Sequence, residues 1–301
     1  MKVALTGITG FVGQNLVPMI VDRLPDVELL TLNIEEDLQR AQQLYPWKQC
    51  QHILTTELDR LVQFNPEIVL HLATVTTERN NTEIIKPMLA ANIEFGVLLL
   101  DALTRCSSFR LFVNTGSFAE YRYGPSQIDD AYLYAATKSA FRRFCDYYSQ
   151  LSGFKYVTVV PYTIYGGKKT AKRLMDYILE SMESETPVDM TAGEQILDFT
   201  HVNDLAAFYV HILQHPDMFC SLDNGEDFHI GTGKGTTVRE LVSIVERVYG
   251  RTCNINFGGR PYRERDTMHA VAPIAKNLGL VRWRATISLE EGVRMMKETH
   301  G

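Results

Sequence analysis

Three glycines in the first thirteen residues constrain the fold most strongly. A short apolar run, Lys2–Leu5, leads into the turn Gly7–Gly13, and a helical pattern follows over Asn15–Arg23. In such a strand–turn–helix, one glycine allows a sharp turn, the next lets the backbone approach a pyrophosphate, and the third lets the helix pack closely on the strand. The helix N-terminus adds free N–H groups and the positive end of a dipole. The segment therefore predicts a dinucleotide site, whose residues are Gly7, Thr9, Gly10, Phe11, Val12 and Gly13.

Strand and helix patterns alternate through the first half of the chain. Strand patterns lie at Val27–Leu32, Ile68–Leu72, Arg110–Asn114 and Tyr156–Val160, and helical patterns lie at Leu58–Phe64, Ile84–Thr104 and Ala135–Ser152. The run Ile68–Leu72 is apolar except for His71, which is typical of a strand covered on both faces, as in a parallel sheet. With right-handed crossovers, this order predicts an α/β fold built on a doubly wound, Rossmann-type parallel sheet.

The pattern changes after Gly166. Helical patterns lie at Arg173–Met182, Asp204–Gln214, Val238–Tyr249 and Ser288–Lys297, with a short strand at Asp198–Val202 and loops at Gly231–Gly235 and Gly258–Arg265. We expect residues 1–165 to form the dinucleotide-binding domain, with 198–215 returning to it. Residues 166–301 then form mainly a smaller substrate-binding lobe. This lobe is expected to close over the C-terminal edge of the sheet, where doubly wound folds bind ligands.

Charge and composition argue against several other classes of protein. The 301 residues carry a net charge of −6 without a basic block, which argues against a nucleic-acid partner. No apolar run is long enough to span a membrane, and the N-terminus lacks a signal-peptide pattern. Five cysteines without CxxC or Cys/His spacing predict free thiols in a reducing, cytoplasmic setting. Neither the cysteines nor the scattered histidines predict a metal site.

Tyr134 and Lys138 form a YxxxK pattern at the start of a predicted helix, which places both side chains on one helix face. A neighbouring ammonium lowers the pKa of a phenol, so such a tyrosine can exchange a proton near neutral pH. Ser117 follows the predicted strand Arg110–Asn114, where its hydroxyl can bond a substrate oxygen. We predict all three as catalytic residues. The alternatives are a solvated helix face for the pair and a turn or N-cap role for the serine.

The end of the second strand bears on the adenosine ribose of a dinucleotide. An acid at this place binds the ribose 2′-hydroxyl, whereas an arginine favours a 2′-phosphate. Asn33 ends the strand here and can bond a hydroxyl, and Glu35 and Glu36 follow it. The nearest arginine, Arg40, lies several residues further on. The segment favours NAD over NADP, with both still open.

The chain resembles, nearly from end to end, the extended short-chain dehydrogenase/reductases of the NAD-dependent epimerase/dehydratase family. The similar segments are Thr6–Gly13, His71–Ala73, Ala91–Ile93, Ser117 with Tyr121, Tyr134 with Lys138, Tyr165-Gly166, Asp198–Ala206 and Ile230–Gly233. The resemblance implies an enzyme that binds a nicotinamide dinucleotide and acts on a nucleotide sugar. The implied cofactor contacts beyond the glycine turn are Asn33, Leu72, Ala73, Thr74, Tyr134, Lys138 and Pro161. The implied substrate contacts are Thr76, Ser117, Phe118, Tyr134, Thr163 and Arg263, with Arg265 as a further candidate.

Within the family, the sequence is similar to nucleotide-sugar 4-ketoreductases of the CDP-abequose synthase type. The similarity lies in His71–Thr74, Asn114–Phe118, Gly193–Phe199 and Gly231–Gly235. Family 4,6-dehydratases carry an Asp-Glu pair directly after the catalytic Ser/Thr, where this chain has Phe118 and Ala119, so we expect no dehydratase. We predict reduction of a 4-keto-deoxysugar nucleotide, with a nucleotide-sugar 4-epimerase that holds NAD tightly as the alternative. The intact YxxxK argues against a non-catalytic cofactor-sensing protein.

Members of this family often dimerise through their central helices. The corresponding segments here are about Asn92–Thr104 and Ala135–Ser152. The resemblance therefore implies a homodimer built on a four-helix bundle. Phe141, Phe144, Tyr147 and Tyr148 are the candidate interface residues, with ordinary core packing as the alternative.

Overall fold

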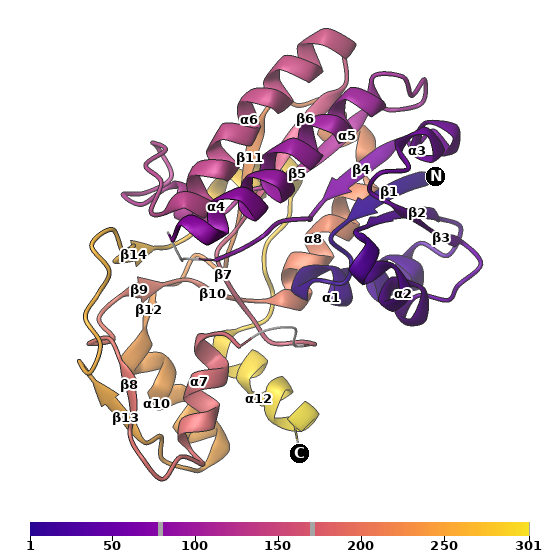
Figure 1. Cartoon of the computed structure of the whole chain (residues 1–301). Coiled ribbons are helices and arrows are strands. Elements are labelled where there is room, and N and C mark those ends of the chain that lie inside the picture. Colours follow the sequence, from indigo (N-terminus) through magenta and orange to yellow (C-terminus); the bar gives the residue numbers. More distant parts are fainter. Residues whose placement is uncertain (78–80, 169–171, 301) are drawn as a thin grey trace.

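A seven-stranded parallel sheet forms the centre of the molecule (Figure 1). The computed structural model describes residues 1–77, 81–168 and 172–300. The sheet contains β1 (Lys2–Thr6), β2 (Glu28–Asn33), β3 (Cys50–Leu54), β4 (Ile68–His71), β5 (Leu111–Thr115), β6 (Lys155–Pro161) and β11 (Glu226–Ile230). Their spatial order is β11-β6-β5-β4-β1-β2-β3, and every pairing is parallel. The strands β2 and β3 are added on one side of β1, whereas β4 and the later strands are added on its other side. In a doubly wound sheet, the ligand crevice lies where the strand order changes in this way, here between β1 and β4. The predicted fold class is confirmed.

Helices cover both faces of the sheet. One face carries α1 (Phe11–Arg23) and α8 (Val202–Gln214), with α2 (Glu35–Leu44), α9 (Pro216–Cys220) and α11 (Ala275–Val281) around them. The other face carries α3 (Leu58–Phe64), α4 (Thr82–Leu89), α5 (Phe95–Leu103) and α6 (Leu133–Ser152). Side chains of a strand alternate between faces, so Leu5 packs under α1 while Ala4 faces the α5–α6 side. Alternate residues of one strand therefore belong to two separate cores.

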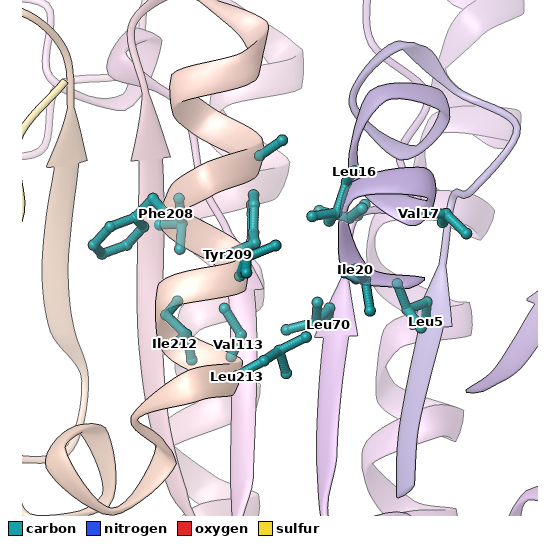
Figure 2. Packing of buried hydrophobic residues seen from close by; sticks show 14 of the residues in the cluster. Leu5, Leu16, Val17, Ile20, Leu70, Val113, Phe208, Tyr209, Ile212 and Leu213 are labelled. Carbon is teal, nitrogen blue, oxygen red and sulfur yellow. The ribbon is translucent and has the colours of Figure 1, made fainter. Parts of the chain in front are cut away.

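The core beneath α1 and α8 joins segments that lie far apart in the sequence. Figure 2 shows Leu16 and Ile20 of α1 and Ile212 and Leu213 of α8 directed toward the strands that carry Leu5, Leu70 and Val113. These side chains are all essentially inaccessible to solvent. Residues after 200 therefore complete the core of a sheet that is built mostly from the first 165 residues.

The predicted helix Ile84–Thr104 is continuous but contains a wider turn. Between α4 and α5, Ala90–Glu94 forms a π turn, and Asn92 within it is buried. The Asn92 amide oxygen accepts hydrogen bonds from the Thr74 hydroxyl and the Val75 N–H. Its NH2 group donates to the Val75 carbonyl and to the Thr137 hydroxyl on α6. The π turn thus directs one amide at both the loop after β4 and the helix that bears Tyr134.

A smaller lobe lies below the C-terminal edge of the sheet in Figure 1. Its helices are α7 (Leu174–Ser181), α10 (Val238–Tyr249) and α12 (Leu289–His300), which share one apolar core. Its short strands are β8 (Val188–Met190) with β13 (Ile255–Phe257), and β9 (Ile196–Leu197) with β12 (Thr236–Thr237) and β14 (His269–Ala270). A further pair joins β7 (Thr163–Tyr165) to β10 (Phe199–His201). The division at residue 165 stays a prediction, and the structure adds that β11 belongs to the main sheet.

Two buried carboxylates tie the C-terminal segments to β10 and α8. Asp198 accepts hydrogen bonds from the Thr232 N–H and hydroxyl, the Gly233 N–H and the Ala272 N–H. Asp204 accepts from the N–H and hydroxyl of Thr286. A buried carboxylate needs such donors, since an unpaired buried charge is very costly. The acidic residues of the segment Asp198–Ala206 therefore have a structural role.

Candidate active site

A cavity of about 1500 Å³ is lined by residues from the C-terminal edge of the sheet and from the smaller lobe. Most of the residues predicted to bind cofactor or substrate line it. They are Gly7, Thr9, Gly10, Phe11, Val12, Asn33, Leu72, Ala73, Thr74, Thr76, Ser117, Phe118, Tyr134, Pro161, Thr163 and Arg263. Gly13 and Lys138 do not line it; Lys138 is buried directly behind Tyr134.

The glycine turn has the geometry that a dinucleotide requires. Gly7 has φ +71°, and a Cβ there would lie 2.6 Å from the Ala73 nitrogen. A Cβ at Gly13 would lie 2.4 Å from the Ile8 Cα, so only glycine lets α1 pack against the turn. Gly10 lines the cavity and caps α1 without a side-chain hydrogen bond, which leaves the first N–H groups of the helix available. The residues present therefore fit a bound dinucleotide.

Thr6 fastens this turn to the neighbouring strand. Its hydroxyl accepts hydrogen bonds from the Leu72 and Ala73 N–H groups, at 3.1 and 3.0 Å. The same oxygen lies 3.0 Å from Nδ1 of His71. Burial lowers the pKa of His71 to about 3, with a smaller contribution from Lys138, so the imidazole is neutral near pH 7. His71 is a buried core histidine that helps to set the spacing of β1 and β4.

An acid that the sequence did not single out lies at the ribose end of the cavity. Asp37, in the first turn of α2, lines the cavity and accepts a hydrogen bond from the Thr9 hydroxyl at 2.8 Å. Glu35 and Glu36 do not line it. The Asn33 NH2 group donates to Thr31 and Ile53, which leaves its amide oxygen as the group that can accept from a ligand hydroxyl. The missed signal was a helix start directly after β2, which places an acid in its first turn.

Tyr134 and Lys138 are both buried on α6, so the solvated-face alternative is wrong. The Lys138 Nζ lies 5.9 Å from the centre of the Tyr134 ring. Burial raises the pKa of Tyr134 to about 12, although hydrogen bonds to the Thr76 and Thr74 hydroxyls act in the opposite direction. The expectation of a lowered phenol pKa is therefore wrong for the protein alone, because burial is the largest influence on Tyr134. Burial also lowers the pKa of Lys138 to about 8, with Glu120 opposing that shift.

Ser117 caps a turn and also lines the cavity. Its backbone is extended, and its hydroxyl accepts from the Ala119 N–H at 3.2 Å as the cap of a 3-10 turn, Phe118–Glu120. The same residue lines the cavity. Glu120 accepts from the Ser117 N–H at 2.6 Å, which completes a capping box. The interpretation of Ser117 as an N-cap is correct, and the capping hydrogen bond fixes the position of its hydroxyl group.

The other predicted substrate residues differ in how they lie relative to the cavity. The Phe118 ring stacks on Tyr162 with centroids 5.7 Å apart. The Thr163 hydroxyl is buried and has no hydrogen-bond partner among the described residues. Arg263 lines the cavity, whereas Arg265 pairs with Asp129 outside it, so the suggestion of Arg265 as a ligand is wrong.

Two further arginines also line the cavity, and one of them belongs to a short basic cluster for which the sequence left open a role in holding an anionic substrate. One is Arg260, next to the predicted loop arginine Arg263. The other is Arg173, whose guanidinium lies 4.2 Å from the centre of the Phe11 ring and whose Nε is buried without a partner among the described residues. A cationic group over an aromatic face, next to the glycine turn, suits an anionic ligand. Sequence spacing gave no sign that Arg173 would meet Phe11.

Within residues 1–77, 81–168 and 172–300, no helix is both long and apolar enough to cross a membrane. No group of three or more His, Cys, Asp or Glu side chains in these ranges could hold a metal ion.

The chain is similar to known proteins over most of its length. A CDP-abequose synthase of Yersinia pseudotuberculosis is 25% identical over 273 residues, which cover 89% of this chain and 91% of that protein. An uncharacterized UDP-glucose epimerase of Bacillus subtilis is 24% identical and covers 97% of this chain and 96% of its own. The crystal structure of a Bacillus cereus UDP-glucuronic acid 4-epimerase with UDP-glucuronic acid and NAD superposes with a TM-score of 0.86, at 21% identity over 99% of this chain and 98% of that one. The expected similarity to enzymes of the CDP-abequose synthase type is confirmed. The model of the NAD dependent epimerase/dehydratase family matches residues 3–231, and this chain belongs to that family.

Proposed function

We propose that the protein is an NAD(P)-dependent oxidoreductase of nucleotide-linked sugars, and that it reduces a 4-keto-deoxysugar nucleotide. The observation that carries this proposal is the convergence of the glycine turn, Ser117 and Tyr134 on one cavity, with Lys138 behind the tyrosine. Relatives that include CDP-abequose synthases support a nucleotide-sugar substrate.

The cofactor is held by the glycine turn, the N-terminus of α1 and the loop after β4, and when bound in reduced form it supplies a hydride. Asn33 and Asp37 favour NAD, because an acid beside the ribose accepts from a 2′-hydroxyl and repels a 2′-phosphate. Lys138 would contact the nicotinamide ribose through a donor of its ammonium group.

The chain's own residues handle the proton. With a pKa of about 12, the Tyr134 phenol is protonated at neutral pH and can donate its proton to the developing alkoxide oxygen of the sugar. Ser117 donates a hydrogen bond to the same oxygen. The Thr76 hydroxyl, which already bonds Tyr134, can donate to the phenolate that remains, whereas the Thr74 hydroxyl donates its proton to Asn92. The Lys138 ammonium stabilises the phenolate further by charge.

The surroundings of Ser117 support a reductase over a dehydratase. Phe118 is occupied in ring stacking, and Ala119 is fully buried. The next carboxylate in the sequence, Glu120, is buried in contact with Arg142 and the Ser117 N–H. An elimination would need a carboxyl group that faces the substrate carbons, and these three positions offer none.

A 4-epimerase is the second candidate, favoured by the Bacillus subtilis relative named as a UDP-glucose epimerase. It would use the same side chains in both directions of hydride transfer. The cofactor content of the freshly purified protein separates the two activities. NAD retained in near stoichiometric amount favours the epimerase, whereas reversible binding and stoichiometric consumption of reduced cofactor favour the ketoreductase.

The test of the proposed mechanism is Tyr134→Phe, assayed with CDP- and dTDP-linked 4-keto-6-deoxysugars. Loss of a general acid lowers kcat by about 10²-fold or more. Tyr249→Phe is the matched control, since it also removes a buried phenol oxygen, but from α10 in the smaller lobe. Wild-type turnover by the Tyr134 variant would overturn the mechanism.

We also propose that the protein is a homodimer through α5 and α6. Support comes from exposed apolar side chains on this side, which include Leu98, Tyr147 and Leu151 at 52%, 60% and 61% exposure. Of the four predicted interface residues, Phe144 and Tyr147 are exposed to solvent, Tyr148 packs at the edge of the core, and Phe141 is wrong because it is buried under α5. Light scattering of the wild type and of Leu151→Glu tests the proposal, with a monomeric wild type as the contrary result.

The five free cysteines support the proposed cytoplasmic location.

A further inference from the structure

A buried carboxylate lies directly under the Ser117 turn. The Glu120 side chain has no solvent exposure. One of its oxygens accepts from the Ser117 N–H at 2.6 Å. The other accepts from Nε of Arg142 at 2.6 Å and from the Ser139 hydroxyl at 3.4 Å. Gly116 makes room for this arrangement, because a Cβ there would lie 2.6 Å from the Glu120 oxygen.

The cluster continues from this carboxylate to two other elements. Arg142 lies on α6, one helical turn beyond Lys138, and its Nη1 donates to Asp227 on β11. Tyr121, which follows the Ser117 turn, donates its hydroxyl to the same Asp227. Two carboxylates, one guanidinium and one phenol thus join the turn, the helix of the YxxxK pair and the neighbouring strand. Such a connected buried network fixes one geometry.

We propose that Glu120 is a positioning residue for the proton-donating site: its carboxylate holds Ser117 at the cavity and, paired with Arg142 one turn along α6 from Lys138, sets the charge beside that lysine. The inference rests on the proposed function for the roles of Ser117 and Lys138, but the interactions of Glu120 stand independently of any substrate.

The charges around Lys138 come from several elements. Glu120 reaches it from the 3-10 turn, Arg142 and Cys145 from its own helix, and His71 from β4. Burial keeps the Cys145 thiol and the His71 imidazole neutral near pH 7, by raising the pKa of the first and lowering that of the second. Glu120 is therefore the negative charge in this set. It opposes the effect of burial, which brings the pKa of Lys138 down to about 8.

The ionisation of Glu120 follows from its partners. Burial raises the pKa of the carboxyl group, and Arg142 opposes that rise through charge and a hydrogen bond. Two donors, from Ser117 and Arg142, are directed at the two carboxylate oxygens at 2.6 Å, while the Ser139 hydroxyl at 3.4 Å has its shorter hydrogen bond to Asp130. A protonated Glu120 would leave Asp227 alone to balance the charge of the buried Arg142. We therefore treat Glu120 and Arg142 as an ion pair.

The test measures the pKa of Lys138 directly, without substrate, by NMR titration of protein labelled at lysine Cε, with Lys138→Met to assign the signal. Glu120→Gln keeps an oxygen that can accept from the Ser117 N–H but removes the charge. We expect the Lys138 pKa to fall by about one unit. Arg142→Gln removes a positive charge and should raise it. If these changes acted only by loosening the fold, water would enter and the pKa would rise toward 10.5 in both variants.

The sign of the change in Glu120→Gln therefore decides the proposal. If this variant does not fold, the double variant Glu120→Gln/Arg142→Gln is used, in which neither position carries a charge. The pKa of Lys138 in the double variant is then compared with its pKa in Arg142→Gln alone. A lower Lys138 pKa in the double variant supports the proposal, and an equal or higher one overturns it. An active Tyr134→Phe with the expected Lys138 shifts would refute the proposed mechanism alone. An inactive Tyr134→Phe with an unmoved Lys138 would refute the role of Glu120 alone.

Discussion

Gly7 offers a direct test of the close approach between β1 and the segment after β4. An alanine at this position would keep φ near +71°, which costs an L-residue about 1–2 kcal/mol. Its Cβ would also lie 2.6–2.8 Å from backbone atoms of Leu72 and Ala73, and backbone cannot move aside like a flexible side chain. Relieving such an overlap costs about 1–3 kcal/mol. It also strains the hydrogen bonds to the Thr6 hydroxyl, each worth about 1 kcal/mol.

The matched control is Gly250→Ala, at the end of α10. Gly250 has φ +70°, but nothing lies within 4 Å of a Cβ placed there. Both variants lose the same conformational freedom, so the difference between them isolates the backbone contact. We expect urea unfolding to place Gly7→Ala about 2–4 kcal/mol below Gly250→Ala in free energy of unfolding. Binding of NADH, followed by its fluorescence, should weaken only in Gly7→Ala. Equal destabilisation of the two variants would refute the reasoning.

Three further predictions concern other charged or titrating groups. Asp37→Ala should raise the affinity for NADP relative to NAD by about tenfold, whereas Glu36→Gln, which removes the same charge outside the cavity, should leave the ratio unchanged in fluorescence titrations. Asp198→Asn replaces one of the two accepting oxygens by an NH2 group that faces two of the four donors, so urea unfolding should reveal a loss of about 2–4 kcal/mol. The folded pKa of His71, about 3, lies below its unfolded value of 6.5, so stability present above pH 6.5 is lost as the pH falls; by pH 5 the loss from this group is about 2 kcal/mol. In His71→Asn the loss between pH 7 and 5 should be smaller by that amount, and an unchanged pH dependence would contradict the assignment.

The local patterns of the sequence predicted much of the fold. The glycine turn, the apolar strand β4 and the long segment after it were found because each depends on contacts between near neighbours in the chain. The strand β3 and the helix α2 were missed, since α2 has strongly polar residues and β3 has mixed ones. The strand β11 was missed as well. Its segment contains three charged or polar residues of five and becomes a sheet strand through pairing with β6.

In the candidate site too, features that depend on near neighbours in the chain were predicted, and features that depend on distant partners were missed. The sequence pointed to Ser117, Tyr134 and Lys138 through spacing, and to most cavity residues through resemblance. It gave no sign of Asp37 or Glu120, nor of the contact that Arg173 makes. Each of these acts through a partner far away in the sequence: Thr9 for Asp37, Phe11 for Arg173, and Arg142 for Glu120.

The sequence by itself determined the positions at which the backbone must turn tightly and the residues that carry acid–base chemistry. These depend on φ values, on the absence of a Cβ and on helical spacing, all of which are local properties. Only the tertiary structure decided the pKa values of the residues that carry this chemistry, Tyr134 and Lys138. Burial raises the pKa of Tyr134 and lowers that of Lys138, and a carboxylate and a guanidinium brought together from the Ser117 turn and α6 counter part of this effect. Desolvation and charge depend on everything that surrounds a group in space, which the order of residues along the chain does not specify.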